Sequence, residues 1–182
     1  VPTFQDYRDL IKEGIQVLGL CIINNEKAPV ICDCLNRGVH VVTDKPLTTT
    51  LKDLRAIERS LQANSDSRLS MLLTLRGDPQ YRTLKEIVEK GQIGNSITIY
   101  AKRSYALRRN TRPEWLFDQR KSGGLIVELA VHDVDFILWT AKSAVKRIDA
   151  FHGKALREEP GDFQDHCQII LQFENDAVAF ID

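Results

Sequence analysis

The segment from Val17 to Thr43 reads VLGLCIINNEKAPVICDCLNRGVHVVT, and it decides the fold. It opens with a continuous apolar run, Val17 to Ile23, of the length expected for a strand buried on both faces. Ala28 to Arg37 has the character of a helix and is followed by Gly38, a preferred helix stop. A second apolar run, Val39 to Thr43, follows directly. Strand, helix and strand joined by such short links predict a right-handed parallel crossover.

The same alternation extends in both directions. Tyr7 to Glu13 predicts a short helix before the first strand, and Thr50 to Ala63 predicts an amphipathic helix after the second. Leu69 to Leu75 is a third apolar strand. Together these segments predict an α/β domain over residues 1–75, the second half of a Rossmann-type parallel sheet. Ligands are expected beyond the carboxyl ends of its strands.

From Arg76 onward the pattern changes. Gln80 to Glu89 and Gly124 to Thr140 predict helices, and a polar, arginine-rich loop runs from Ser104 to Ser122. Consecutive strands joined by short turns favour a mostly antiparallel, open sheet, and we expect a second, α+β domain over residues 76–182 for substrate binding and oligomerisation. Its strands are predicted at Ile97 to Arg103, Ala144 to Gly153, His166 to Glu174 and Ala177 to Ile181.

Composition gives no reason to expect a nucleic-acid or membrane partner. The 25 Lys and Arg residues are balanced by 25 Asp and Glu residues. No apolar run is long enough to span a bilayer, and no signal peptide is visible. The cysteines show no metal-site spacing, so we expect no metal site and interpret them as small, buried apolar side chains in a reducing cytoplasm. They are Cys21, Cys32, Cys34 and Cys167.

Thr43-Asp44-Lys45-Pro46 follows the second predicted strand. A lysine just beyond the carboxyl end of a parallel strand lies where such sheets bind ligands, and Pro46 fixes the turn that carries it. The alternative is a solvated surface lysine, since lysines are usually exposed. The tetrapeptide alone favours that alternative.

Ionisable residues interrupt the apolar helix predicted from Gly124 to Thr140. At 3.6 residues per turn, Glu128, His132 and Asp135 fall within an arc of about 60°, so we expect one polar stripe. Asp133 points elsewhere, toward solvent or a neighbouring loop. Buried ionisable groups are costly unless paired or used. The stripe predicts either a functional histidine or a core histidine satisfied by carboxylates, and both interpretations remain open.

Two segments resemble the Gfo/Idh/MocA family of NAD(P)-dependent oxidoreductases. Gly38 to Pro46, GVHVVTDKP, is similar to the family's G-x-H-V-x-x-E-K-P. Ser122 to Asp135, SGGLIVELAVHDVD, is similar to its G-G-G-x-x-x-D-x-G-x-H-x-x-D. The segments RGDPQY at 76–81 and KGQIG at 90–94 also resemble family segments, in the right order. The resemblance covers essentially the whole chain.

The resemblance implies hydride transfer between NAD or NADP and a secondary alcohol of a sugar, inositol or related polyol. Lys45 matches the family's active-site lysine, His132 its acid/base histidine and Glu128 an aspartate one turn before it. A neutral imidazole can take the hydroxyl proton, and Lys45 can polarise the developing carbonyl. Glu128 can orient His132 or bind a neighbouring hydroxyl.

Cofactor contacts are also implied by the resemblance. Asn24 falls where the family has an asparagine against the cofactor, close to the Asp44-Lys45-Pro46 segment. Trp115 resembles a tryptophan that approaches the nicotinamide in some members; the alternative is a packing residue that pins its loop. The family commonly forms homodimers or homotetramers, and an uncovered sheet face would favour such self-association.

Several positions depart from the family pattern. Glu128 replaces an aspartate, Asp44 a glutamate, Ile22-Ile23 a Thr-Pro pair, and Lys27 the histidine that follows it. Two alternatives therefore stay open. One is a non-catalytic cofactor- or sugar-sensing protein of the same fold, and the other is a reductase of a non-carbohydrate substrate.

The family's glycine loop has no counterpart here. Its G-x-G-x-x-G turn binds the pyrophosphate at a helix N-terminus, and the ten glycines of this chain include no such spacing. We expect the chain to be a fragment of a protein with roughly 120 to 170 further residues. Alone, it is expected to bind NAD(H) or NADP(H) far more weakly than its parent.

Overall fold

The structure is a computed structural model that describes residues 2–156 and 163–182. The chain divides into two compact units, Val1–Leu72 and Leu73–Asp182, and each is taken by itself. Among the described residues, none of the helices combines the length and the apolar content that crossing a lipid bilayer requires.

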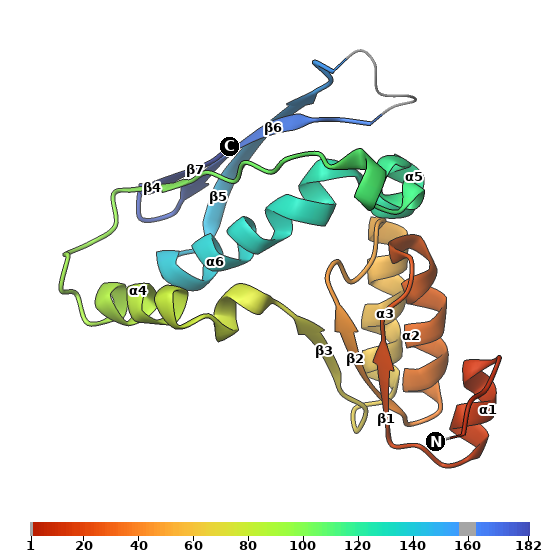
Figure 1. Cartoon of the computed structure of the whole chain (residues 1–182). Coiled ribbons are helices and arrows are strands. Elements are labelled where there is room, and N and C mark those ends of the chain that lie inside the picture. The colour runs from red at the N-terminus through yellow and green to blue at the C-terminus, as the bar shows by residue number, and fades with distance from the viewer. Residues whose placement is uncertain (1, 157–162) are drawn as a thin grey trace. The chain divides into compact units, whose positions relative to one another are not determined.

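The first unit is built on a three-stranded parallel sheet. Its strands are β1 (Val17–Leu20), β2 (His40–Asp44) and β3 (Leu69–Leu72), hydrogen-bonded in the order β1-β2-β3. Helix α2 (Lys27–Asn36) joins β1 to β2, and α3 (Leu51–Ala63) joins β2 to β3; the two helices pack side by side (Figure 1). The predicted α/β arrangement with a parallel sheet is confirmed.

Two strands are shorter than their apolar runs. β1 ends at Leu20, opposite Thr43, and the chain then enters a short 3-10 helix, η1 (Asn24–Glu26). β3 ends at Leu72 because its partner β2 ends at Asp44, so Leu73 has no strand beside it. Another 3-10 helix, η2 (Thr74–Gly77), begins there. An apolar run predicts that a segment is buried, whereas a strand also needs a neighbouring strand as hydrogen-bonding partner.

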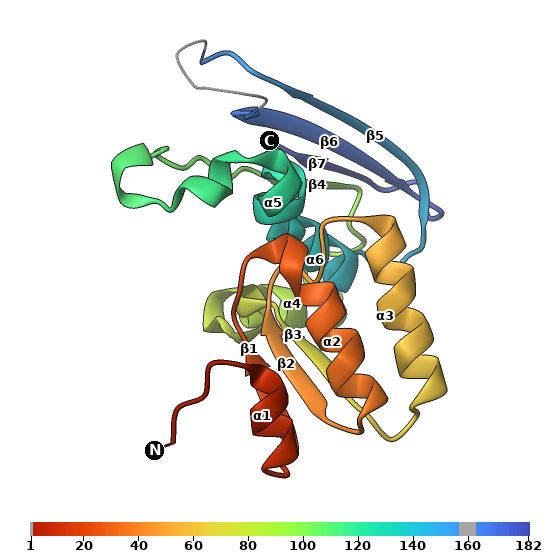
Figure 2. The same ribbon diagram turned by 90° about the vertical axis from the view of Figure 1, so that its right-hand side faces the viewer.

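The second unit contains a four-stranded mixed sheet. Its strands are β4 (Thr98–Ala101), β5 (Val145–Gly153), β6 (His166–Phe173) and β7 (Val178–Ile181). They lie in the order β4-β7-β6-β5, and only the β4–β7 pair is parallel (Figure 2). The predicted, mostly antiparallel sheet is therefore confirmed.

Helix α6 (Val131–Ala141) covers one face of this sheet, which we call the inner face; the opposite face is the outer face. Ile137 and Ala141 pack with Ile169 and Leu171 of β6 in one buried cluster. Helix α4 (Pro79–Glu89) contacts α6, where Tyr81 meets Phe136 edge to face with the ring centroids 4.8 Å apart. The segment expected as a plain loop, 104–122, contains three short helices: η3 (Arg109–Thr111), η4 (Glu114–Phe117) and α5 (Gln119–Ser122).

The four cysteines are free thiols. Cys34 and Cys167 are buried, as expected for small apolar side chains, and burial raises the pKa of Cys34 to about 11. Cys32 is half-buried. Cys21 is exposed, contrary to expectation, because the chain has already left β1 at Leu20.

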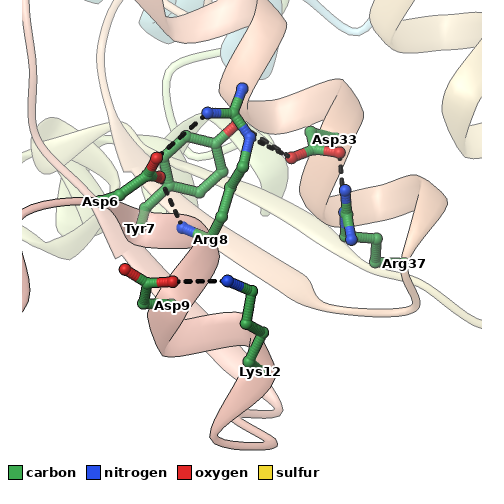
Figure 3. A network of polar contacts seen from close by, with 7 residues as sticks. All are labelled: Asp6, Tyr7, Arg8, Asp9, Lys12, Asp33 and Arg37. Atoms are coloured by element: carbon green, nitrogen blue, oxygen red, sulfur yellow. Dashed lines mark hydrogen bonds and ion pairs between the residues drawn. The ribbon is translucent and has the colours of Figure 1, made fainter.

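Helix α1 (Tyr7–Lys12) is tied to α2 through one carboxylate (Figure 3). The Tyr7 hydroxyl donates to Asp33 Oδ2 at 2.9 Å, and Arg37 Nε donates to Asp33 Oδ1 at 2.8 Å. The hydrogen bond from Arg37 holds the pKa of Asp33 below its ordinary value. Burial and the neighbouring Asp33 raise the pKa of the Tyr7 hydroxyl. Asp33 therefore links helix α1 to helix α2.

Asp33→Asn should lower the free energy of unfolding by about 1 kcal/mol at pH 7, a value already reduced for the partial exposure of these groups. The folded pKa of Asp33 is depressed, so its ionic contribution is present above about pH 4 and is lost as the pH falls through the folded pKa. Urea denaturation of both proteins at pH 7 and about pH 3 measures this. The difference should shrink in acid; an equal difference at both pH values would contradict it.

Candidate functional site

The Asp44-Lys45-Pro46 turn leaves the carboxyl end of β2, the central strand of the parallel sheet. The Lys45–Pro46 peptide is cis, Pro46 is buried, and Lys45 is half-buried. Thr43, buried just before the turn, donates its hydroxyl to the Leu20 carbonyl at 2.9 Å and to the Asp44 carbonyl at 3.3 Å. The turn is therefore anchored to β1 as well as β2, at the sheet edge where ligands bind in such folds.

Lys27, the first residue of α2, has no exposed surface. Its ammonium lies 2.6 Å from Asp44 Oδ1 and donates to the carbonyls of Asp44 at 3.2 Å, Lys45 at 3.3 Å and Pro46 at 3.1 Å. Four oxygens of one turn thus surround one buried charge. Sequence reasoning noted Lys27 only as a departure from the family pattern and missed this role.

Asn24 opens η1, beyond the carboxyl end of β1, and is 2% exposed. Since β1 and β2 are parallel neighbours, their carboxyl ends share one edge of the sheet. The first unit therefore gathers four of the predicted site residues, Asn24, Asp44, Lys45 and Pro46, at that edge.

The predicted helix from Gly124 to Thr140 is not one regular α-helix. A π-helical turn, η5 (Ile126–Ala130), precedes α6. A π-helix bonds residue i to i+5, so the residues after it are rotated relative to an α-helical count. The expected single stripe of Glu128, His132 and Asp135 is wrong for this reason. Glu128 lines a cavity, and Asp135 binds an arginine. His132, which lies between these two residues in the sequence, is half-buried.

Of the two surroundings expected for Asp133, solvent or a neighbouring loop, the structure shows the second: Asp133 is buried, with 6% of its surface exposed, against the segment that follows β4. Arg103, two residues beyond β4, donates Nε to Asp133 Oδ2 at 2.6 Å and Nη2 to Oδ1 at 2.8 Å. Asp133 raises the pKa of the Arg103 guanidinium. This bidentate pair compensates for the burial of both charges and fastens α6 to the sheet.

A second bidentate pair involves Asp135, three residues after His132. Arg76, in η2, donates Nε to Asp135 Oδ2 at 2.8 Å and Nη2 to Oδ1 at 2.7 Å. The Arg76 guanidinium also lies over the Trp139 ring, 5.4 Å from its centroid. Asp135 raises the pKa of Arg76. His132 therefore belongs to a helix that two arginine–aspartate pairs hold within its first five residues.

A cavity of about 340 Å³ opens in the second unit, between the segment after β4, the η5 turn and the ends of β6 and β7. Glu128 and Asp133 line it together with Arg103, whereas His132 is not among its lining residues. Asp165 and His166 also line it, and Asp165 Oδ1 lies 2.7 Å from His166 Nδ1. Backbone N–H groups of Leu156 and Ala155 lower the pKa of Asp165 to about 2.

Trp115 lies in η4 and is half-buried. The neighbouring Phe117 is buried against Phe163, with ring centroids 5.1 Å apart, and Arg109 lies over the Phe117 ring. Phe117 therefore helps to pin the loop. In residues 2–156 and 163–182, no three His, Cys, Asp or Glu side chains gather as metal ligands would.

The site residues fall into two groups, one in each unit. Asn24, Asp44, Lys45 and Pro46 belong to Val1–Leu72, and the remaining three, Trp115, Glu128 and His132, belong to Leu73–Asp182. Sequence reasoning missed Lys27 and Arg103, which hold these groups in place. The signal for Lys27 was a basic residue at the start of a helix, where the helix dipole favours acidic residues. No sequence pattern pairs Arg103 with Asp133.

Comparison with known proteins gives two family matches. Residues 1–71 match the profile described as the oxidoreductase family with an NAD-binding Rossmann fold. Residues 81–182 match that of the GFO/IDH/MocA C-terminal domain. The two matches leave only the 72–80 segment uncovered.

Curated relatives extend well beyond this chain. It is 29% identical over 182 residues to the uncharacterized oxidoreductase YrbE of Bacillus subtilis, covering 97% of this chain and 51% of the relative. It is 28% identical over 187 residues to the myo-inositol 2-dehydrogenase of Thermotoga maritima, covering 99% and 53%. The chain thus spans about half the length of the curated relatives it matches.

Solved structures share the fold. An oxidoreductase from Thermotoga maritima superposes with a TM-score of 0.89 at 23% identity, covering 96% of this chain and 53% of that one. The myo-inositol 2-dehydrogenase from Lactobacillus plantarum superposes with a TM-score of 0.88 at 19% identity, covering 98% and 53%. At these identities the likeness is one of fold.

The Arg103–Asp133 pair should be strongly coupled. Removing either charge leaves the other buried and unpaired, so Arg103→Met and Asp133→Asn should each destabilise the protein by about 3 kcal/mol. The double variant should lose much less than the sum of the two. The adjacent Lys102–Asp182 pair is exposed and serves as the control; Lys102→Met should cost under about 0.5 kcal/mol. Additive losses in urea denaturation at the Arg103–Asp133 pair would contradict this account.

Proposed function

Because this chain belongs to the Gfo/Idh/MocA family of oxidoreductases, we propose that the full-length protein transfers a hydride between NAD or NADP and a secondary alcohol carbon. We propose a sugar, an inositol or a related polyol as substrate. The names of the relatives support that class, since several are inositol 2-dehydrogenases. One observation carries the proposal: a lysine on an anchored turn at the carboxyl end of β2.

The first unit suits a dinucleotide at the shared carboxyl edge of β1 and β2. Asn24 is a buried polar residue at this edge, and the turn that carries Lys45 is anchored there too. In our proposal, Asn24 and the Asp44-Lys45-Pro46 turn bind the cofactor, and Trp115 contacts its nicotinamide. When bound, the nicotinamide accepts the hydride from the substrate carbon or returns it.

Oxidation of an alcohol also requires removal of the hydroxyl proton and stabilisation of the developing carbonyl. His132 is a half-buried imidazole on a helix held by two arginine–aspartate pairs, which suits a general base that must keep its orientation. Lys45 donates to the substrate oxygen and stabilises its partial charge. Glu128, in the cavity of the second unit, binds a further hydroxyl of the polyol or orients His132.

A non-catalytic cofactor- or sugar-sensing protein is the second candidate. The observation that favours it is Glu128, which replaces the family's aspartate in a cavity lined by other carboxylates. Cofactor fluorescence and absorbance, measured with a panel of polyols, separate the two, because fluorescence reports binding and absorbance reports turnover. Turnover supports the enzyme, and binding without turnover supports the sensor.

The outer face of the four-stranded sheet supports self-association, and we propose a homodimer or homotetramer. Tyr100, Phe180 and Ile170 occupy one row across β4, β7 and β6, and Phe151 of β5 lies on the same face. Tyr100 is 63% and Phe151 62% exposed. Exposed apolar residues gathered on one face mark an interaction surface, and a second copy presents a matching one.

Phe151→Glu should shift the assembly toward monomers, because it places a charge in the apolar interface. Light scattering coupled to size exclusion measures the mass. Leu51→Glu is the matched control, since Leu51 is 70% exposed in the first unit. A monomeric wild-type protein, or a Phe151→Glu variant that keeps the wild-type mass, would show that this face is not the interface.

Lys45→Met should keep the fold and lose most of kcat, since it removes an interaction made mainly in the transition state. His132→Asn should lower kcat by about 10²–10⁴-fold and flatten the acid limb of the pH–rate profile. Steady-state kinetics of the full-length protein measure both. Activity of Lys45→Met within a few-fold of wild type would contradict the proposed catalytic role of Lys45. If His132→Asn unfolds while a rescued version stays active, His132 is a core residue only.

A further inference from the structure

Lys27 is the buried charge that the proposed chemistry does not use. An ammonium without exposed surface is expensive unless oxygens replace its water, and here the oxygens that accept from it belong to Asp44, Lys45 and Pro46. The oxygens of the Asp44-Lys45-Pro46 turn therefore replace the water around the Lys27 ammonium, and the ammonium holds those oxygens in place. Neither can move alone without leaving charge and carbonyls unpaired.

The position of these carbonyls matters. The Asp44 carbonyl belongs to the peptide before the Lys45 Cα, and the Lys45 carbonyl belongs to the peptide after it. Both oxygens are bound by Lys27 Nζ, at 3.2 and 3.3 Å. Thr43 Oγ1 also donates to the Asp44 carbonyl, at 3.3 Å. With both flanking peptides fixed, the direction of the Lys45 Cα–Cβ bond is fixed as well.

Stability of the helix alone would not favour a lysine at position 27. Lys27 is the first residue of α2, where the positive end of the helix dipole disfavours a cation. An apolar side chain of similar length would fill the same space without a charge to compensate. A residue that breaks a local rule inside a well-formed unit usually serves function.

We infer that Lys27 is a positioning residue, whose buried ammonium fixes the peptides on both sides of Lys45 and thereby aims the Lys45 side chain at the ligand edge of the sheet. What Lys45 then does rests on the proposed function. How Lys45 is held does not, so the two can be tested apart.

The first test follows Lys45 by NMR in the full-length protein. Reductive methylation with ¹³C-formaldehyde labels accessible lysines, and the Lys45 resonance is the one missing from Lys45→Arg. In Lys27→Met it should broaden and move toward the positions of exposed lysines. Lys52→Met, which removes an exposed lysine of α3, is the control and should leave it unchanged. An unchanged Lys45 resonance in Lys27→Met would overturn the inference.

The second test is kinetic. With cofactor and polyol saturating, Lys27→Met should lower kcat at least about tenfold and change the substrate KM less, because misaimed groups cost mainly the chemical step. If the role of Lys27 is purely structural, Lys27→Met lowers the melting temperature and leaves kcat and the Lys45 resonance unchanged, and this result would refute positioning.

If Lys27→Met does not fold, Lys27→Gln keeps two N–H donors and should shift the Lys45 resonance and kcat less, in the same direction. No shift in Lys27→Gln would also refute positioning. An inactive wild-type protein would refute the proposed function while the NMR result still decides positioning.

Discussion

One buried ammonium group organises the ligand edge of the first unit. Lys27 has no access to water, so its charge must be compensated by protein oxygens, and the chain supplies four from consecutive residues. This requirement joins the start of α2 to the turn after β2. Thr43 adds the link to β1. Helix α2, strands β1 and β2, and the turn that carries Lys45 are thereby held by one polar network.

The second unit meets the same physical problem in another way. Its helix α6 is mostly apolar and packs on the sheet, yet carries Asp133 and Asp135 beside His132. Each aspartate is bound by both ends of an arginine fork, Arg103 for one and Arg76 for the other. Such pairing makes burial tolerable and also fixes the helix rotation. In both units, the groups that we propose for chemistry are borne on backbone held by ion pairs with a buried member, Lys27 in the first unit and Asp133 in the second.

Much of the fold could be predicted from the sequence, because the signals are periodic. Apolar runs such as Val39 to Thr43 and stop residues such as Gly38 place strands and helices to within one to three residues. Strand ends were less predictable, since β3 stops where its partner β2 stops and not where its apolar run does. The π-helical turn before α6 gave no sequence signal, so the side-chain count from Glu128 to Asp135 failed.

The candidate site was predictable only where a residue carries its own signal. Lys45 stands out through its place before a proline at a strand end, and His132 through its apolar surroundings. Arg103 carries no signal of its own, and Lys27 carries only its unfavourable place at a helix start, because their roles depend on partners 30 and 17 to 19 residues away. Long-range pairs of this kind are fixed by tertiary packing and leave no periodic trace. For the same reason the sequence left open whether Asp133 faces solvent or a neighbouring loop.

The hydride transfer that we propose runs between a polyol carbon and a nicotinamide. Incubation of the full-length protein with oxidised cofactor and an inositol carrying deuterium at its carbinol carbons tests it most directly. Mass spectrometry of the reduced cofactor should find one deuterium per nicotinamide, because a hydride passes from carbon to carbon without exchange with water. Reduced cofactor without deuterium would contradict direct hydride transfer. No reduced cofactor with any labelled polyol would contradict the assignment of substrate class.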